Sequence, residues 1–488
     1  MAQNACSIRS ELRTLTNSEL CTFSKKSSRE KRPRGHEEGG GVLSGENPTN
    51  DVKSIGFDLS LLKGCRRKVI SDFYLQKCQM NKIIEEIDAT PTFYHVISHS
   101  NCVLESSGYV DITGRCDLQN LPDNFYFFTK SGDLVAFNAH DYDTGTVFVA
   151  KGDSPGFYVK QNSQTVKNNC EQIELLPYGD ALYFAWLDRD LTIAGRVLFK
   201  KEGEVLTKLV HLKNTMMEIP SIAAHLSKNS IKTDFKIDKH FKPILSVCLN
   251  DECKEQTLLR LIAEECKCSV EDIINYNLFA ISAENASRVG INSDFLNSQR
   301  IDGSIAPLIG LKNFVSLPKQ KTGFKAFCIY KQYGIYGKQN QGSEILSKIF
   351  NKIHIRNTKN VSLVILENLP STSPNHSNEI NNIPLGSGIY FISYQQFLTN
   401  NHLYKKAKEI LKEKSTKNNF YHIKPKDDLI YNVVLSNNPN TFSGAFSQVG
   451  DIIRVGFPVI GYHSIRETCF IPDIEEYNRS LNLLFNFL

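Results

Sequence analysis

The chain has 488 residues, of which 41% are hydrophobic and 22% are charged, and its formal net charge is +5. That length fits two or three domains, and the composition is that of a globular protein rather than a disordered one. The small net charge argues against nucleic acid as a partner, and no apolar run approaches the roughly eighteen residues of a membrane span.

The first 65 residues are predicted to form a disordered tail. Residues 25–50 are rich in Lys, Arg, Glu, Gly, Ser and Asn, so they have few apolar side chains to offset the entropy of ordering. The spacing of apolar residues in 6–22 is compatible either with one short amphipathic helix or with a frayed terminus. Charged residues within the first twenty interrupt any secretory apolar region, which predicts an intracellular protein. The thirteen cysteines are scattered and odd in number, and are expected to be free thiols.

From residue 68 onward the pattern is that of a folded domain. Helices are predicted at 68–88 and 93–105, and aromatic or β-branched runs predict strands at 125–130, 134–140, 146–153 and 157–160. Residues 171–250 read mostly as strands, followed by helices at 255–267 and 270–276 with Ser269 as a cap. Residues 295–488 alternate helix-like and strand-like segments, which predicts an α/β domain with a mixed or parallel sheet.

Five strings resemble motifs of one enzyme family and occur in that family's order, at 90–95, 186–196, 219–226, 294–302 and 462–467. The second of them reads W-L-D-R-D-L-T-I-A-G-R. Chance matches become rare when several motifs keep their order. On these strings the chain resembles the zinc aminopeptidases that include aspartyl aminopeptidase and yeast-type vacuolar aminopeptidase I.

The resemblance implies an α/β catalytic domain of the two-zinc aminopeptidase type, with a parallel-centred mixed sheet, interrupted by a β-rich dimerisation domain. Residues 66–155 and 296–488 would form the catalytic domain and residues 156–295 the inserted one. The family assembles as dodecamers, so a homo-oligomer, or a mixed oligomer with an active paralogue, is implied here. The family's locations imply the cytoplasm or the vacuole.

A two-zinc aminopeptidase needs His and carboxylate ligands around both ions and a Glu that takes a proton from the attacking water. By resemblance, Asp302 and His463 keep two metal-ligand positions, and Asp153 keeps the aspartate of the first catalytic motif. Lys151 stands where a ligand histidine belongs, and an ammonium has no lone pair for zinc. Tyr333 stands at the position of the base, Gly334 at that of a ligand, and Gln395 at or next to that of another.

These replacements predict a non-catalytic structural or regulatory homologue with no zinc bound at full occupancy. The alternative is an active zinc metallo-aminopeptidase that releases N-terminal residues from peptides, and a pocket that only binds peptides is a third interpretation. Trp186, Asp188, Arg189, Asp190 and Arg196 are interpreted as structural, with an Asp-Arg-Asp network. Lys151 is expected to replace the metal's charge by pairing with Asp302 or Asp153, because inherited carboxylates would otherwise repel one another.

Overall fold

The computed structural model describes residues 80–115, 120–226, 236–248, 257–335, 349, 353, 355, 357–375, 383–394, 402–414, 432–436 and 450–488. The chain separates into two units, Met1–Arg67 and Lys68–Leu488, and all described residues belong to the second. The predicted tail (1–65), the helix considered at 6–22 and Gln395 lie outside the described residues.

The central sheet has nine strands in the order β1-β2-β3-β15-β4-β16-β20-β18-β19. Strands β15, β4, β16 and β20 are mutually parallel at its centre, whereas β3 and β18 are antiparallel to their neighbours β15 and β20. The predicted parallel-centred mixed sheet is therefore confirmed. The strands are β1 (Val110–Asp111), β2 (Asn124–Phe128), β3 (Leu134–Ala139), β4 (Gly145–Lys151), β15 (Phe324–Tyr330), β16 (Val361–Leu366), β18 (Tyr390–Tyr394), β19 (Asn432–Ser436) and β20 (Ile452–Gly456).

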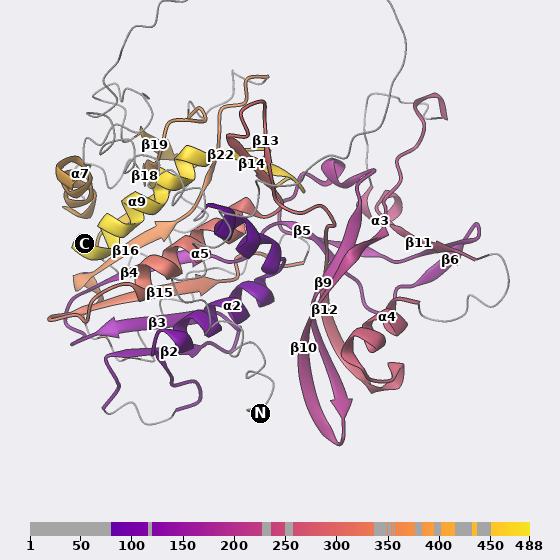
Figure 1. The fold of residues 1–488 in the computed structure, drawn as a ribbon, viewed down its shortest axis with the longest axis horizontal. Helices are drawn as coiled ribbons and strands as arrows, with labels where there is room; N and C mark the ends of the chain where they lie inside the picture. Colours follow the sequence, from indigo (N-terminus) through magenta and orange to yellow (C-terminus); the bar gives the residue numbers. More distant parts are fainter. Residues whose placement is uncertain are drawn as a thin grey trace, which may run out of the picture. The chain divides into compact units, whose positions relative to one another are not determined.

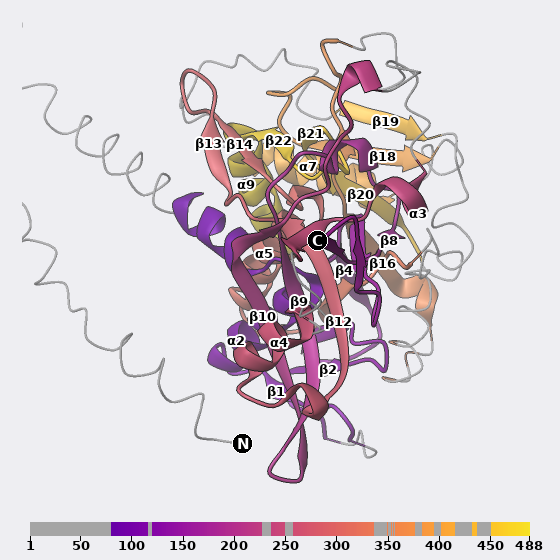
Figure 2. The same ribbon diagram turned by 90° about the vertical axis from the view of Figure 1, so that its right-hand side faces the viewer.

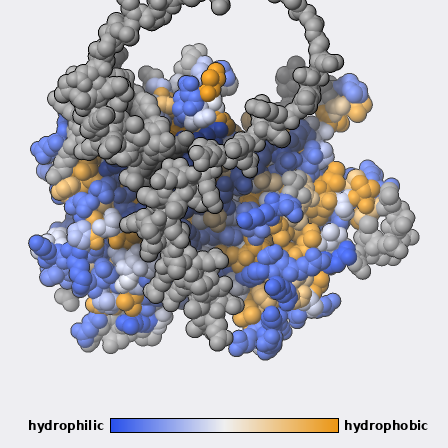
Figure 3. Space-filling model, in the orientation of Figure 1, coloured by the Kyte–Doolittle hydropathy of each residue, from blue (hydrophilic) through white to orange (hydrophobic). Residues whose placement is uncertain are grey.

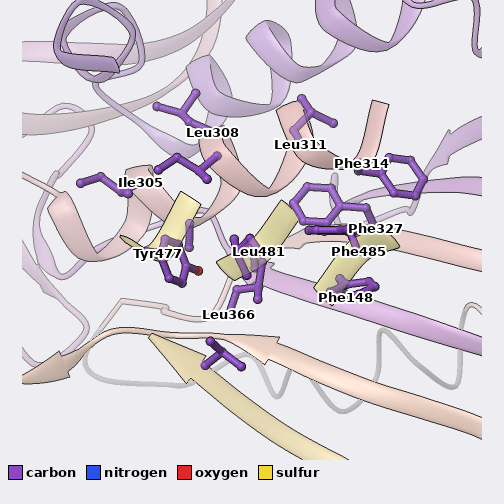
Figure 4. Packing of buried hydrophobic residues seen from close by; sticks show 14 of the residues in the cluster. Phe148, Ile305, Leu308, Leu311, Phe314, Phe327, Leu366, Tyr477, Leu481 and Phe485 are labelled. Carbon is purple, nitrogen blue, oxygen red and sulfur yellow. The ribbon is translucent and has the colours of Figure 1, made fainter. Parts of the chain in front are cut away.

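Helices cover one face of this sheet (Figure 1). They are α2 (Phe93–Ser106), α5 (Ile301–Val315), α7 (His402–Lys414) and α9 (Ile471–Phe487), and α2 agrees with the helix predicted at 93–105. Helix α5 is buried on nearly all sides, because α2, α9 and the sheet all pack against it. Figure 4 shows Phe148 from β4 beside Phe485 from α9, with ring centres 3.8 Å apart.

A second, five-stranded antiparallel sheet is formed by residues 156–282, in the order β10-β9-β12-β5-β8. Its long strands run side by side in Figure 2. Gly195 of β9 lies so close to β12 that an added Cβ would meet the Asn277 carbonyl oxygen, so no larger residue fits there. The elements are β5 (Gly156–Val159), β8 (Leu175–Tyr178), η3 (Tyr183–Trp186), β9 (Leu191–Lys201), β10 (Glu204–Met217), α4 (Thr257–Cys266), η5 (Val270–Asp272) and β12 (Ile273–Ser282).

Two smaller sheets complete the described fold. One has the order β11-β7-β6 and the other β13-β14-β22-β21-β17. The expected boundary between residues 295 and 296 falls at the start of β14, which pairs with β22 near the C-terminus, and the division into two domains stays a prediction. The elements are β6 (Thr165–Lys167), β7 (Cys170–Gln172), η4 (Ala224–Leu226), α3 (Ile237–His240), β11 (Ile244–Val247), β13 (Ser287–Val289), β14 (Phe295–Ser298), η6 (Thr358–Asn360), β17 (Leu369–Pro370), β21 (Pro458–Ile460) and β22 (Glu467–Phe470).

Two sequence-based expectations are wrong. The helix predicted at 270–276 is a single turn, η5, capped by Ser269, and β12 then begins at Ile273 because these residues pair with β9. Six described cysteines are free thiols, but Cys248 is disulfide-bonded. In the part of the chain that the structure describes, no helix has the length and apolar character to cross a membrane.

Candidate functional site

The predicted site residues meet at one edge of the central sheet. Lys151 is the last residue of β4, and Tyr333 follows the end of β15, which runs parallel to β4. Because parallel strands end at the same edge, their carboxyl ends place polar side chains side by side, as is usual for sites in open α/β sheets. Helix α5 begins beside them with Asp302 in its first turn, and His463 lies in the turn before β22.

The Lys151 ammonium contacts the Asp302 carboxylate in the protein interior. The two side chains are 2% and 0% exposed. Burial disfavours both charges, but each charge favours the other. The pKa of Lys151 is therefore raised well above its ordinary value, and the pKa of Asp302 is lowered below its ordinary value. The sequence-based prediction that Lys151 pairs with one of two inherited aspartates is confirmed for Asp302.

Tyr333 and His463 extend this contact into a hydrogen-bonded chain. The Lys151 ammonium lies 3.2 Å from the Tyr333 hydroxyl, which lies 3.1 Å from His463 Nε2. His463 Nδ1 lies 3.0 Å from the Asp180 carbonyl oxygen, so Nδ1 donates a hydrogen bond to it. His463 Nε2 also lies 3.5 Å from Asp302 Oδ2. Lys151, Asp302, Tyr333 and His463, called the Lys151 cluster below, are therefore linked by direct polar contacts, while Asp302 Oδ1 is buried without a hydrogen-bond partner among the described residues.

Asp153 lies next to the Lys151 cluster but has different partners. Its carboxylate accepts hydrogen bonds from the Tyr178 hydroxyl at 2.6 Å and from the backbone N–H groups of Gln332 and Tyr333 at 2.9 Å each. Three donors satisfy a buried carboxylate without a metal or an ammonium. Asp153 thus fixes the loop that carries Tyr333.

Glu467 is a member of the site that sequence reasoning missed. In the sequence it is only the last residue of the 462–467 string, whereas a buried glutamate beside an aspartate is a usual sign of a perturbed site. Its two carboxyl oxygens accept from the Asp302 and His463 backbone N–H groups at 2.9 and 2.8 Å. Burial, assisted by the Asp302 charge, raises the pKa of Glu467 to about 8. The Glu467 carboxyl therefore holds the backbone at Asp302 and His463 in place.

The residues present do not fit a pair of zinc ions. Zinc takes thiolate, imidazole or carboxylate ligands, and the described residues contain no group of three or more such side chains that could hold a metal. Lys151 takes up the Asp302 oxygen that a metal would need, and Tyr333 takes up His463 Nε2. Gly334 has no side chain, and its carbonyl oxygen accepts from the Gly179 N–H.

A cavity of about 30 Å³ lies beside the Lys151 cluster. Asp153, Arg300, His463 and Glu467 line its polar side, and Trp186 and Phe279 line its apolar side. A polar cavity of that volume can hold one or two water molecules.

The 186–196 string is placed in the second sheet and the turn before it. The Trp186 ring is buried and packs edge-on against Phe157 at 5.2 Å. The predicted Asp-Arg-Asp network is wrong for the described contacts: the Asp188 carboxylate accepts the Ser221 N–H at 2.8 Å, and Arg189 pairs with Glu284 at 3.8 Å. Asp188 has a left-handed backbone with φ of 56°, and its carboxylate bonds to the Ser221 backbone, not to Arg189. The Asp190 carbonyl oxygen accepts the Ala283 N–H.

Comparison with known proteins gives a consistent relationship. The family described as "Aminopeptidase I zinc metalloprotease (M18)" matches residues 87–380. An aspartyl aminopeptidase of Dictyostelium discoideum is 30% identical over 48% of this chain and 57% of its own length. A probable aspartyl aminopeptidase of Ricinus communis is 27% identical over 80% of this chain and 92% of its own length.

The fold is also that of solved structures. The S. cerevisiae mApe1 dodecamer matches with a TM-score of 0.68 and 20% identity, over 83% of this chain and 95% of that chain. At 20% identity, this structural likeness shows the shared fold and does not bear on the site.

Proposed function

The chain belongs to the M18 family of aminopeptidase I zinc metalloproteases, and we propose that it is a non-catalytic member. The observation that carries this proposal is the position of the Lys151 ammonium, paired with Asp302 and bonded to Tyr333. The Lys151 ammonium lies among the residues at the inherited ligand positions. It has no lone pair for a metal, and it cannot generate the hydroxide that a metal would supply for attack on a substrate. Tyr333 cannot replace a catalytic glutamate, because burial raises its pKa above the ordinary value for tyrosine.

The experiment measures zinc and hydrolysis on the same purified full-length chain. After incubation with excess zinc and dialysis, elemental analysis is expected to find well under two zinc ions per chain. Aminoacyl fluorogenic substrates, including an N-terminal aspartyl one, are expected to stay intact with added zinc or cobalt. About two tightly held zinc ions per chain, together with hydrolysis that a chelator abolishes, would establish the active aminopeptidase instead.

The role we propose for a non-catalytic member is structural or regulatory, through assembly. Large hydrophobic side chains that remain exposed gather in residues 156–295, and include Val166, Phe184, Val205, Ile222, Leu226, Val247 and Ile274. Hydrophobic residues are also prominent on the half of the surface that holds the second sheet in Figure 3. Contiguous exposed apolar surface is typical of protein contacts, and the S. cerevisiae neighbour is a dodecamer.

We therefore infer a homo-oligomer, or a mixed oligomer with an active relative. Light scattering at micromolar concentration is expected to show a particle several times the chain mass of 55.2 kDa. If the chain alone is a monomer and also fails to join a co-expressed active relative, the proposal of assembly is wrong. A location in the cytoplasm or the vacuole is proposed from the family resemblance and is tested by imaging a tagged chain.

A further inference from the structure

Two cationic side chains converge on the Tyr94 ring of helix α2. The guanidinium carbon of Arg196, on β9, lies 4.6 Å from the ring centre. The Lys331 nitrogen, just after β15, lies 5.9 Å from the same centre and 5.4 Å from the centre of the Tyr178 ring. Both residues are half-buried. Within the described part of the chain, neither side chain forms a hydrogen bond or an ion pair, and Arg196 Nε is buried without an acceptor.

The acidic groups near these cations are already engaged. Asp153 accepts from Tyr178 and from two backbone N–H groups. Asp133 accepts the Lys331 N–H with one oxygen and two hydroxyl groups with the other. Burial lowers the pKa of Lys331, with Asp153 opposing that effect and Arg196 adding to it.

Contacts with aromatic rings offset only part of this imbalance. A cation over an aromatic face is worth about 0.5–2 kcal/mol, whereas two like charges that share one ring repel each other. Partly buried cations without a counter-charge are unfavourable unless an anion joins them. The two cations therefore lack a balancing negative charge among the described residues.

The neighbouring side chains are neutral and suited to a polar ligand. Arg196 lies opposite Leu209 and His211 lies opposite Ala194 in the β9–β10 ladder, so Arg196 and His211 share one face of the sheet. The His211 and His95 ring centres are 6.4 Å apart. Burial lowers the pKa of both, that of His95 to about 4, so the imidazoles add hydrogen-bonding groups but no further positive charge.

We propose that Arg196 and Lys331 form a binding site for a small, doubly charged oxyanion such as phosphate. The planar guanidinium can bind two oxygens at once and the lysine supplies a point charge, so a dianion would neutralise both. The site is separate from the Lys151 cluster and does not depend on the loss of catalysis. It gives helix α2 and the second sheet a shared ligand at the place where Tyr94 meets Arg196.

The test is calorimetric titration of the full-length chain with inorganic phosphate in a low-salt buffer. One phosphate per chain is expected to bind, and Arg196→Gln and Lys331→Met are each expected to weaken that binding about tenfold or more. Arg189→Gln is the matched control, because Arg189 lies in the same segment but is exposed and paired with Glu284. It should leave the affinity unchanged.

Two further variants keep the test decisive if a neutral substitution disturbs folding. Arg196→Lys retains the charge and is expected to retain measurable binding. Lys331→Asp places a carboxylate beside Arg196 and is expected to fold, as judged by circular dichroism, while binding no phosphate. The proposal is overturned if the parent binds no phosphate at millimolar concentration, or if Arg196→Gln and Lys331→Asp bind it as the parent does.

Discussion

The Lys151 ammonium and the Asp302 carboxylate form an ion pair in which neither side chain is more than 2% exposed. The pair joins the end of β4 to the first turn of α5, two elements that are far apart in the sequence and adjacent in the core. Each charge favours the charged form of the other, since the pKa of Lys151 is raised and the pKa of Asp302 is lowered. Breaking it by changing one partner leaves the other charge buried and unpaired.

Lys151→Met is expected to lower the free energy of unfolding by about 3–5 kcal/mol. Methionine fills a similar volume, so the loss reflects the unpaired Asp302 rather than a cavity. The measurement is the denaturant midpoint of the variant against the parent, with the slope of the transition compared to confirm that the same surface unfolds.

The matched control is Lys160→Met, which removes a lysine that pairs with Glu174 at the surface. These side chains are 49% and 30% exposed, and such pairs contribute about 0–1 kcal/mol. An unchanged midpoint in Lys151→Met would mean that the buried pair exists but does not stabilise the fold.

Tyr333→Phe is expected to cost about 1–3 kcal/mol of stability. The ring contacts with Tyr178 and His463 are retained, but Lys151 loses an acceptor and His463 Nε2 loses its hydrogen-bond partner. Tyr158→Phe is the control, because the Tyr158 hydroxyl bonds to Asn277 from a half-buried position. If both variants unfold at the parent's midpoint, the chain from Lys151 to His463 is not stabilising.

The sequence predicts the architecture well where periodicity and neighbours agree. The strands β4, β15 and β16 are continuous apolar runs, as buried parallel strands usually are, and α5 and α9 have clear helical patterns. The failure at 270–276 has a physical cause: Ile273 to Tyr276 are β-branched, aromatic or turn-forming residues that pair with β9, and short apolar runs do not distinguish helix from strand.

The sequence predicts which residues stand at the ligand and base positions of the site, but not the full geometry of the site. Lys151 and Asp302 are 151 positions apart, and only the family order of motifs indicates that they meet. The sequence does not predict the Tyr178 hydroxyl or the Glu467 carboxyl, because each lies at the end of a strand, β8 and β22, whose position at the site depends on tertiary packing. Nor could the sequence show that Arg189 pairs with Glu284 and leaves the flanking aspartates to backbone groups.

Lys151→His is expected to produce no aminopeptidase activity. It restores one imidazole, but Tyr333 remains at the base position and Gly334 still lacks a side chain. Activity needs both an oriented base and the second set of ligands, and such groups act as a unit. The measurement is hydrolysis of aminoacyl fluorogenic substrates with zinc or cobalt. Chelator-sensitive turnover above the parent's level would show that one ligand is enough to rebuild the site.

Glu467 makes a contribution to stability that depends on pH. Its pKa is raised from an ordinary value of 4.5 to about 8 by burial and by Asp302. Between these values the native state keeps a proton that the unfolded chain has lost, so the contribution of Glu467 falls as pH rises through this window. The slope for one such proton is at most about 1.4 kcal/mol per pH unit. The lowered pKa of Asp302 acts in the opposite sense and only in acid, below its ordinary value of 3.8.

Glu467→Gln removes that titration, so the variant's free energy of unfolding should depend less on pH between 4.5 and 8 than the parent's. The amide replaces one of two oxygens that accept from the Asp302 and His463 N–H groups, which lowers stability by about 1–3 kcal/mol near pH 4.5, the lower end of the window. The measurement is denaturant unfolding of both proteins at half-unit pH steps. The parent's advantage is expected to shrink as pH rises toward 8, because the unfolded parent has lost a proton that its native state still holds, whereas the variant has no such group. A constant difference across the window would contradict the prediction. It would show that Glu467 is ionised in the native state and that neighbouring groups stabilise its buried charge.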